Sequence, residues 1–223
     1  MYLLNVFTNE AGDFGTPMGI IEDLDVKISE DERLKITKES GFTEVVFIES
    51  LQNPTISIYT PEQNLPFASH ALVGTHYYLV NKHNILSNSI ISKGNKIDFF
   101  NKDGLYWADA DISILPKFNL KGYPNISSID SLNLENTSDF EHILVWSWVD
   151  EKEGTIRART FAPDWDIPED EANGSGSMLL AHKLNRSIKV FHGNGSIIHA
   201  YPTQQNHISV GGLVKLMSES AIT

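Results

Sequence analysis

Two stretches of the chain, 102 residues apart, follow the same pattern of residue types. Residues 59–66 read YTPEQNLP and residues 161–168 read FAPDWDIP, so an aromatic, a small residue, Pro, an acid, a variable residue, Asn or Asp, an aliphatic and Pro recur in order. Each copy continues through small polar residues into an apolar segment typical of a helix. A repeat at about half the chain length indicates two copies of one domain. We expect the halves to face each other, with the functional site in the cleft between them.

The order of predicted elements assigns the chain to the α+β class. Each half has several strands and one apolar helix, at residues 71–80 and at about 175–184. The first helix is apolar on nearly every face, so we expect strands to enclose it. Residues 113–141 are rich in Pro, Gly, Asn and Ser and are expected to be mostly loop. We place the domain boundary just before them, giving an N-terminal domain at 1–110 and a C-terminal domain at 111–223.

A third helix is predicted near the N-terminus from its two ends. Ser29 and Glu32 have the spacing of a capping box, in which each side chain bonds to the backbone of the other residue. Gly41 suits a left-handed C-terminal cap, so the helix should end at about Ser40. Residues 45–48, VVFI, follow it and are typical of a buried strand.

Composition excludes several classes of partner and site. The formal net charge of −12 argues against a surface that binds nucleic acid or an anionic membrane. The chain has no Cys, which excludes disulfides, thiolate metal sites and Cys nucleophiles. The first residues lack the basic flank and apolar run of a signal peptide, and no stretch approaches the length of a membrane span. We therefore expect a cytoplasmic protein.

The second copy leads into a segment that suits an anionic ligand. Residues 169–177 read EDEANGSGS. Gly and small residues at a helix start leave backbone amides open, and the helix dipole adds partial positive charge there. Gly174 and Ser175 are therefore candidates for holding a carboxylate. The alternative is a plain N-cap, with Asp170 as a solvated acid.

Two further titratable residues lie at matching or unusual places in the first half. His70 precedes the buried helix, in the region where the second half places Asp170. A His and an acid on opposite walls of a cleft could hold a substrate or pass a proton, whereas the alternative is a structural His. Glu44 directly precedes the buried strand at 45–48, an odd place for a charge. It is either a strand-edge charge facing water or a buried Glu tuned to exchange protons near neutral pH.

No sequence motif indicates a cofactor. The eight His residues lack zincin spacing, and no nucleotide, flavin or pyridoxal motif is present. We expect proton-transfer chemistry that needs neither a metal nor an organic cofactor.

Several ordered motifs resemble those of the phenazine-biosynthesis PhzF-like isomerases, which have the diaminopimelate-epimerase-like fold. Residues 6–8 and 15–17 resemble the family's opening VFT and GNP, and residues 42–47 resemble its SETVF. Residues 60–70 are similar to its FTP…ELPFAGH, and residues 159–175 to its RxFxP…EDPATGS. A closing VGG matches as well.

This resemblance implies a fold and an activity. The fold would be two similar domains, each a barrel-like, mostly antiparallel sheet around a central helix, related by a pseudo-twofold axis with the active site in the cleft. The activity would be a cofactor-independent proton shift. The best-known member acts on trans-2,3-dihydro-3-hydroxyanthranilate, and members often form homodimers. The partner expected here is a small carboxylate substrate.

The resemblance also implies roles for particular residues. The family's catalytic Glu falls on Glu44, its cleft His on His70 and its second acid on Asp170. The substrate-binding positions are then Thr16, Thr43, Ser69, Gly174 and Ser175.

Four residues beside the inferred pocket depart from the family pattern, so the substrate could differ from the phenazine precursor. They are Thr16 for Asn, Ser69 for Gly, Glu171 for Pro and Asn173 for Thr.

Two rival functions stay open at this point. The chain could be an epimerase that inverts a carbon with Glu44 and Asp170 as opposed acid and base. It could also be a non-catalytic binding protein that keeps the carboxylate site.

Overall fold

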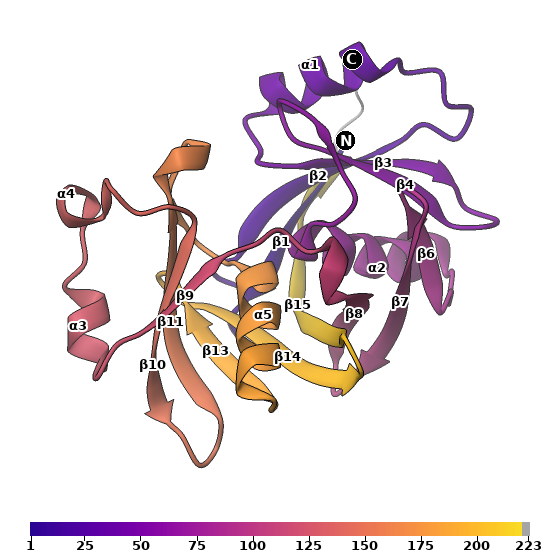
Figure 1. Cartoon of the computed structure of the whole chain (residues 1–223). Helices are drawn as coiled ribbons and strands as arrows, with labels where there is room; N and C mark the ends of the chain where they lie inside the picture. Colours follow the sequence, from indigo (N-terminus) through magenta and orange to yellow (C-terminus); the bar gives the residue numbers. More distant parts are fainter. Residues whose placement is uncertain (220–223) are drawn as a thin grey trace.

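The computed structural model describes residues 1–219, in which strands predominate over helices (Figure 1). The strands are β1 (Tyr2–Thr8), β2 (Thr16–Glu22), β3 (Val45–Ser50), β4 (Thr55–Tyr59), β5 (Asn64–Leu65), β6 (Ser89–Ser92), β7 (Asn95–Lys102), β8 (Leu105–Asp111), β9 (Asn119–Gly122), β10 (Ile143–Asp150), β11 (Thr155–Ala162), β12 (Ile167–Asp170), β13 (Ile188–His192), β14 (Ser196–Gln204) and β15 (His207–Glu219). The α-helices are α1 (Glu30–Ser40), α2 (Ser69–His83), α3 (Ile126–Asp130), α4 (Leu134–Thr137) and α5 (Gly174–Leu184). Two single turns of 3-10 helix are η1 (Ile112–Ile114) and η2 (Pro163–Trp165).

The two halves repeat one order of strand pairing. In the first half β2 is parallel to β3, and β4 is antiparallel to both β3 and β5 and parallel to β6. In the second half β9 to β13 pair in the same order and the same directions. Helix α2 lies between β5 and β6 in the chain, as α5 lies between β12 and β13. The predicted α+β class with two similar domains is therefore confirmed.

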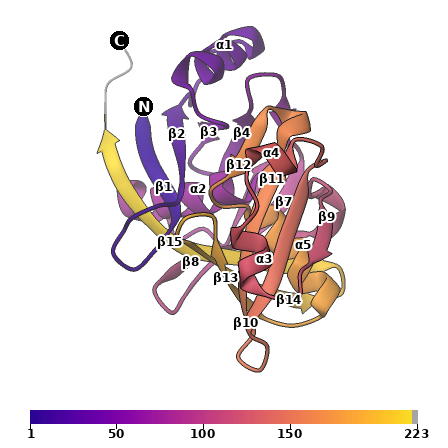
Figure 2. The ribbon, with the colours of Figure 1, turned by 90° about the vertical axis from the view of Figure 1, so that its left-hand side faces the viewer.

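Strand β15 joins the two halves. It pairs with β14 of the second half, and along its length with β8 and then β1 of the first half. The first half is thereby a closed ring of strands, β1-β2-β3-β4-β6-β7-β8-β15, whereas the second half is open at β9 (Figure 2). The exact division at residue 110 stays a prediction.

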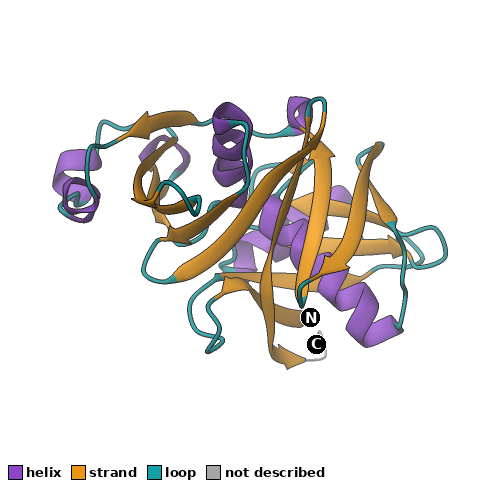
Figure 3. Cartoon of the chain, turned by 90° about the horizontal axis from the view of Figure 1, so that it is seen from below, coloured by secondary structure: helices purple, strands orange, loops and turns teal. Residues whose placement is uncertain are grey.

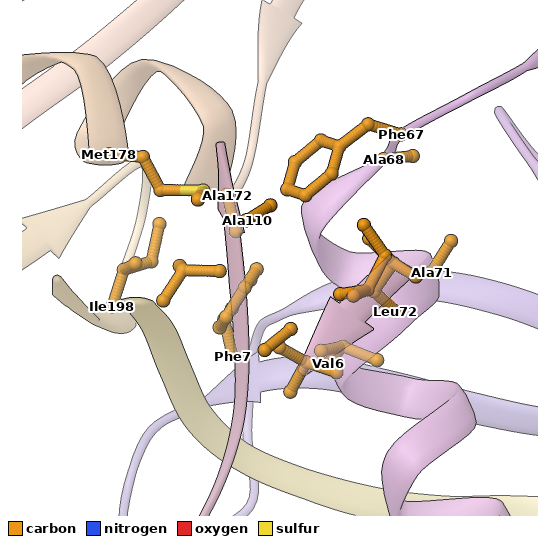
Figure 4. Close-up of a cluster of buried hydrophobic side chains, with 14 of the residues drawn as sticks. Val6, Phe7, Phe67, Ala68, Ala71, Leu72, Ala110, Ala172, Met178 and Ile198 are labelled. Carbon is orange, nitrogen blue, oxygen red and sulfur yellow. The ribbon is translucent and has the colours of Figure 1, made fainter. Parts of the chain in front are cut away.

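Each half wraps its sheet around one apolar helix, and the two interiors are continuous. Seen from below, the strands curve round the long helix α2 (Figure 3). Helix α5 contacts α2. One buried cluster includes α2, α5 and strands of both halves. Val6 and Phe7 of β1 lie between Leu72 of α2 and Ile198 of β14 (Figure 4). The shared core fixes how the halves meet and so fixes the cleft.

A smaller helix covers the outer face of each sheet. Helix α1 covers Val45 and Phe47 of β3, and α3 covers Val145 and Phe161 of the second half. Strand β3 is therefore buried on both faces, which explains its unbroken apolar sequence. The predicted capping box at the start of α1 and the left-handed Gly41 at its end are both present.

The expectation that residues 113–141 are mostly loop was wrong in part, because β9, α3 and α4 lie there. Strand β9 has only four residues, two of them Asn and Gly, and it pairs along one edge only. Helices α3 and α4 are about one turn each and depend on Asn caps. Such short polar elements carry no periodic apolar signal. None of the helices in residues 1–219 is long and apolar enough to cross a membrane.

Candidate active site

A cavity of about 680 Å³ lies between the two halves. Its walls come from the segments after β4 and before β3 and α2 in the first half, and from those around β12 and the start of α5 in the second. The lining residues are 41–44, 60–63, 65 and 67–70 on one side, and 116, 118, 160, 162, 164–167, 170, 172, 173 and 175 on the other.

The starts of α2 and α5 meet at this cavity. A Cβ at Gly174 would lie 2.4 Å from Ser69 Oγ and 2.7 Å from Ser69 Cβ, so the two first residues of these helices touch. Helix α2 begins without a side-chain cap, whereas the Asn173 Oδ1 of α5 accepts the Gly176 N–H at 2.5 Å. The amides before Gly176 stay available in α5, as do those of the first turn of α2. Two helix dipoles thus direct partial positive charge to one place, which suits a carboxylate.

Glu44 and His70 form a buried ion pair in the cavity wall. Glu44 Oε2 lies 3.0 Å from His70 Nε2, and the two side chains are 15% and 10% exposed. The ring N–H is poorly aligned with that oxygen, so the contact is mainly electrostatic. Glu44 lies here because the turn at Gly41 ends α1 and β3 begins at Val45, directly after Glu44.

The surroundings of this pair shift the two pKa values in opposite directions. Burial alone would raise the pKa of the Glu44 carboxyl, but the charge of His70 and contacts from His70 and Thr43 lower the pKa below its ordinary value. Burial alone would lower the pKa of His70, but Glu44 and, more weakly, Asp170 raise it. The pair therefore favours an ionised Glu44 and a protonated His70, and an ionised carboxylate is the form that can accept a proton.

Asp170 lies on the opposite half and is held by its own loop. Its Oδ1 accepts the Ala172 N–H and its Oδ2 accepts the Asn173 side-chain N–H, both at 3.1 Å. It lines the cavity, and its charge reaches His70 and the buried His192. Two hydrogen bonds fix the orientation of its carboxylate, which suits Asp170 to positioning a substrate.

The structure brings most of the predicted substrate-binding residues to the cavity. Thr43, Ser69 and Ser175 line it, and Gly174 lies against Ser69 at the helix starts. Thr16 is not among the lining residues in the described part of the chain; its hydroxyl donates to the Ala172 carbonyl at 3.3 Å. Any contact of Thr16 with substrate stays a prediction.

Aromatic residues on the second half were not predicted as part of the site. Phe118, in the connection before β9, and Trp165, in η2, both line the cavity. Their ring centroids are 5.4 Å apart at 71°. Trp165 lies inside the second repeat copy, at the variable position, and this is the only sequence signal that could have pointed to it.

No metal site accompanies these residues in the described part of the chain. Within residues 1–219, no group of three or more His, Asp or Glu side chains is placed to hold a metal ion. Among the residues that line the cavity, five are acidic and none is Lys or Arg.

Several solved structures share this fold of two similar halves. A phenazine biosynthesis protein of the PhzF family from Enterococcus faecalis has a TM-score of 0.78 at 17% identity, over 97% of this chain and 96% of that one. A phenazine biosynthesis PhzC/PhzF protein from Clostridium difficile has the same TM-score and identity, over 100% and 98%. A hydroxyproline epimerase from Agrobacterium vitis is more distant, with a TM-score of 0.57 at 10% identity, over 97% and 90%.

A comparison with protein-family models matches the first part of the chain. Residues 4–97 match the family model described as phenazine biosynthesis-like protein. That segment contains Glu44 and His70 and extends from β1 into β7. This match and the likeness of the fold to PhzF-family structures support the resemblance that the motifs predicted.

Proposed function

We propose that the protein is a cofactor-independent isomerase that moves a proton between carbons of a small cyclic or unsaturated carboxylate. The observation that carries the proposal is the buried Glu44–His70 pair in a cavity where two helix starts meet. The match of residues 4–97 to the phenazine biosynthesis-like family model supports the proposal, as does the likeness of the fold to an epimerase that binds trans-4-hydroxy-L-proline.

The substrate carboxylate would bind at the amides of Gly174 and Ser175, beside Ser69. The ionised Glu44 would take a proton from a neighbouring carbon, so that a C–H bond breaks and an O–H bond forms. The electron pair would spread through the adjacent double bond toward the carboxylate, where the helix starts stabilise the added charge. Glu44 would then return the proton to another carbon, and the double bond would have migrated with no net oxidation.

His70 and Asp170 would act on this step from two sides. Protonated His70 keeps Glu44 ionised until the substrate proton arrives and offers a donor to developing negative charge. Asp170, fixed by two hydrogen bonds, would orient the substrate from the other half. No step requires a metal or an organic cofactor.

The test is uptake of deuterium from D₂O into a panel of small cyclic and unsaturated carboxylates. We expect uptake by the wild type and a loss of about a hundredfold or more in Glu44→Gln. Glu62→Gln is the matched control, because it makes the same change at an exposed acid of the same cavity. Full exchange by Glu44→Gln on a true substrate would show that the assignment of Glu44 is wrong.

The same experiment separates the two rival functions. An epimerase using Glu44 and Asp170 as opposed acid and base would place the label on the carbon whose configuration inverts. A binding protein would bind ligand equally well in wild type and Glu44→Gln with no exchange in either.

The natural substrate belongs to this proposal as well. A ring compound like trans-2,3-dihydro-3-hydroxyanthranilate, the substrate of the best-known PhzF-like member, is the compound with which the panel should begin. The expected homodimer and the cytoplasmic location stay predictions.

A further inference from the structure

One wall of the cavity is a preorganised aromatic surface. The rings of His142 and Trp165 are stacked, with centroids 4.6 Å apart and planes at 9°. Phe118 packs against the edge of this stack, 5.4 Å from Trp165. All three residues belong to the second half, and Trp165 and Phe118 line the cavity.

Two contacts with Asp164 hold the stack in place. Asp164 accepts the His142 backbone N–H at 2.8 Å through one oxygen and faces its ring Nδ1 at 2.7 Å through the other. The two-point contact fixes the imidazole, and the imidazole in turn supports one face of the Trp165 indole. A large aromatic side chain whose orientation is fixed in advance loses little entropy when a ligand stacks on it.

The indole nevertheless keeps much of its surface open. Trp165 is 43% exposed although one ring face is covered by His142, and the residue borders the cavity. An exposed aromatic surface costs hydration free energy that a planar ligand would recover.

The distribution of charge decides which part of a ligand would lie there. Of the five acids that line the cavity, Glu62, Asp164 and Asp166 lie on the side of the loops that follow β4 and β11. Glu44 and Asp170 lie near the helix starts, but Glu44 is paired with His70 and Asp170 accepts two N–H bonds. Anionic groups are repelled from these carboxylates and attracted to the helix starts at Ser69 and Gly174. A bound carboxylate would therefore turn its charged end to the helices and its uncharged part toward the aromatic wall.

We propose that the Trp165 indole is a stacking subsite for a planar, conjugated part of the substrate, a proposal that rests on the proposed function of the cavity. The cavity of about 680 Å³ is far larger than a single-ring carboxylate needs, so it has room for both contacts. Flat conjugated carboxylates are then the preferred substrates. Saturated ring carboxylates gain less from contact with the Trp165 indole.

The test compares benzoate with cyclohexanecarboxylate, which differ in ring planarity and share the carboxylate. Affinities are measured by ligand-detected NMR titration in the Glu44→Gln background, so that turnover plays no part. We expect Trp165→Leu to weaken benzoate about tenfold and cyclohexanecarboxylate less than twofold. Trp165→Phe keeps a planar ring and should retain most of the benzoate affinity.

Trp148→Leu is the matched control, because Trp148 packs on Trp146 and Arg186, away from the cavity lining. It should leave both affinities unchanged. The subsite is overturned if Trp165→Leu weakens the binding of benzoate and cyclohexanecarboxylate equally, or changes neither affinity. It is also overturned if benzoate does not bind to the Glu44→Gln protein that retains Trp165. The subsite and the isomerase can fail separately. If Trp165→Leu removes the preference for benzoate but no protein that retains Glu44 exchanges deuterium, the subsite is supported and the isomerase is refuted.

Discussion

The contact between the starts of α2 and α5 makes a sharp prediction about Gly174. An added Cβ would lie 2.4 Å from Ser69 Oγ, 2.7 Å from Ser69 Cβ and 3.0 Å from Phe7 Cε2. The Ser69 hydroxyl can rotate away, but its Cβ is attached to the backbone of α2 and can move only with the helix. Gly174→Ala must therefore push apart the two helix starts that form the predicted carboxylate site.

The size of the effect follows from two opposed contributions. Overpacking of this kind costs about 1–3 kcal/mol of the free energy of unfolding. Replacing Gly by Ala in a helix returns about 0.4–1 kcal/mol by restricting the unfolded chain. We expect Gly174→Ala to be destabilised by about 1–2 kcal/mol, which lowers the Tm by about 2–8 °C for a domain of this size.

A double-mutant cycle measured by urea unfolding tests the reasoning. Ser69→Gly removes both of the closest atoms, and the third, Phe7 Cε2, is 3.0 Å away, so it should recover most of the stability lost in Gly174→Ala. Gly122→Ala is the control, because a Cβ there meets nothing closer than 3.4 Å. A Gly174→Ala variant as stable as wild type, or one that Ser69→Gly does not rescue, would refute the close contact of the two helices.

Two further predictions concern charged pairs and are measured by the same unfolding assay. The pKa of His70 is raised above its ordinary value of 6.5, so the stability that protonated His70 contributes is present below pH 6.5 and is lost as pH rises through the raised pKa. The pKa of Glu44 is lowered, so the stability that ionised Glu44 contributes is lost as pH falls below about 4.5. His70→Asn should flatten the fall in stability as pH rises above about 6.5, and parallel curves for both proteins would contradict the ion pair. Arg159 makes two hydrogen bonds to Glu169 and two to backbone carbonyls, so Arg159→Met should cost about 3 kcal/mol. The exposed Lys35→Met is its control, with a change below about 0.5 kcal/mol, and equal effects would contradict a structural role for Arg159.

The architecture could be predicted from the sequence because its signals are local and repeated. The two copies at residues 59–66 and 161–168 mark the same turn before the same central helix in each half. Strand β3 and helices α1 and α2 each carry strong patterns of apolar residues or caps. Closure of the first barrel by β15 could not be predicted, because pairing with β1 and β8 depends on contacts across nearly the whole chain.

The site was predictable to the extent that motifs carry it. Glu44, His70 and Asp170 were expected to share a cleft, and all three line one cavity. The aromatic wall was not expected, because it brings together residues from three separate segments. No spacing along the chain relates Phe118 to His142 or either of them to Trp165, and only the folded second half makes them neighbours.

The duplicated topology explains why the two walls differ in role. Glu44 directly precedes β3, and His142 directly precedes β10, at corresponding places in the two halves. The next residues pair alike, since Val45 lies opposite Gly19 and Ile143 opposite Asn119.

At one of these places the side chain is buried against His70, where its proton affinity is shifted by a neighbouring charge. At the other the side chain is bound to Asp164 and stacked behind Trp165, so it is withdrawn from the cavity. Because His142 is engaged in this way, the proton exchange that we propose for Glu44 has no counterpart at that position of the second half. The asymmetry favours a single residue that takes and returns the proton on one face of the substrate, with the opposite half positioning it.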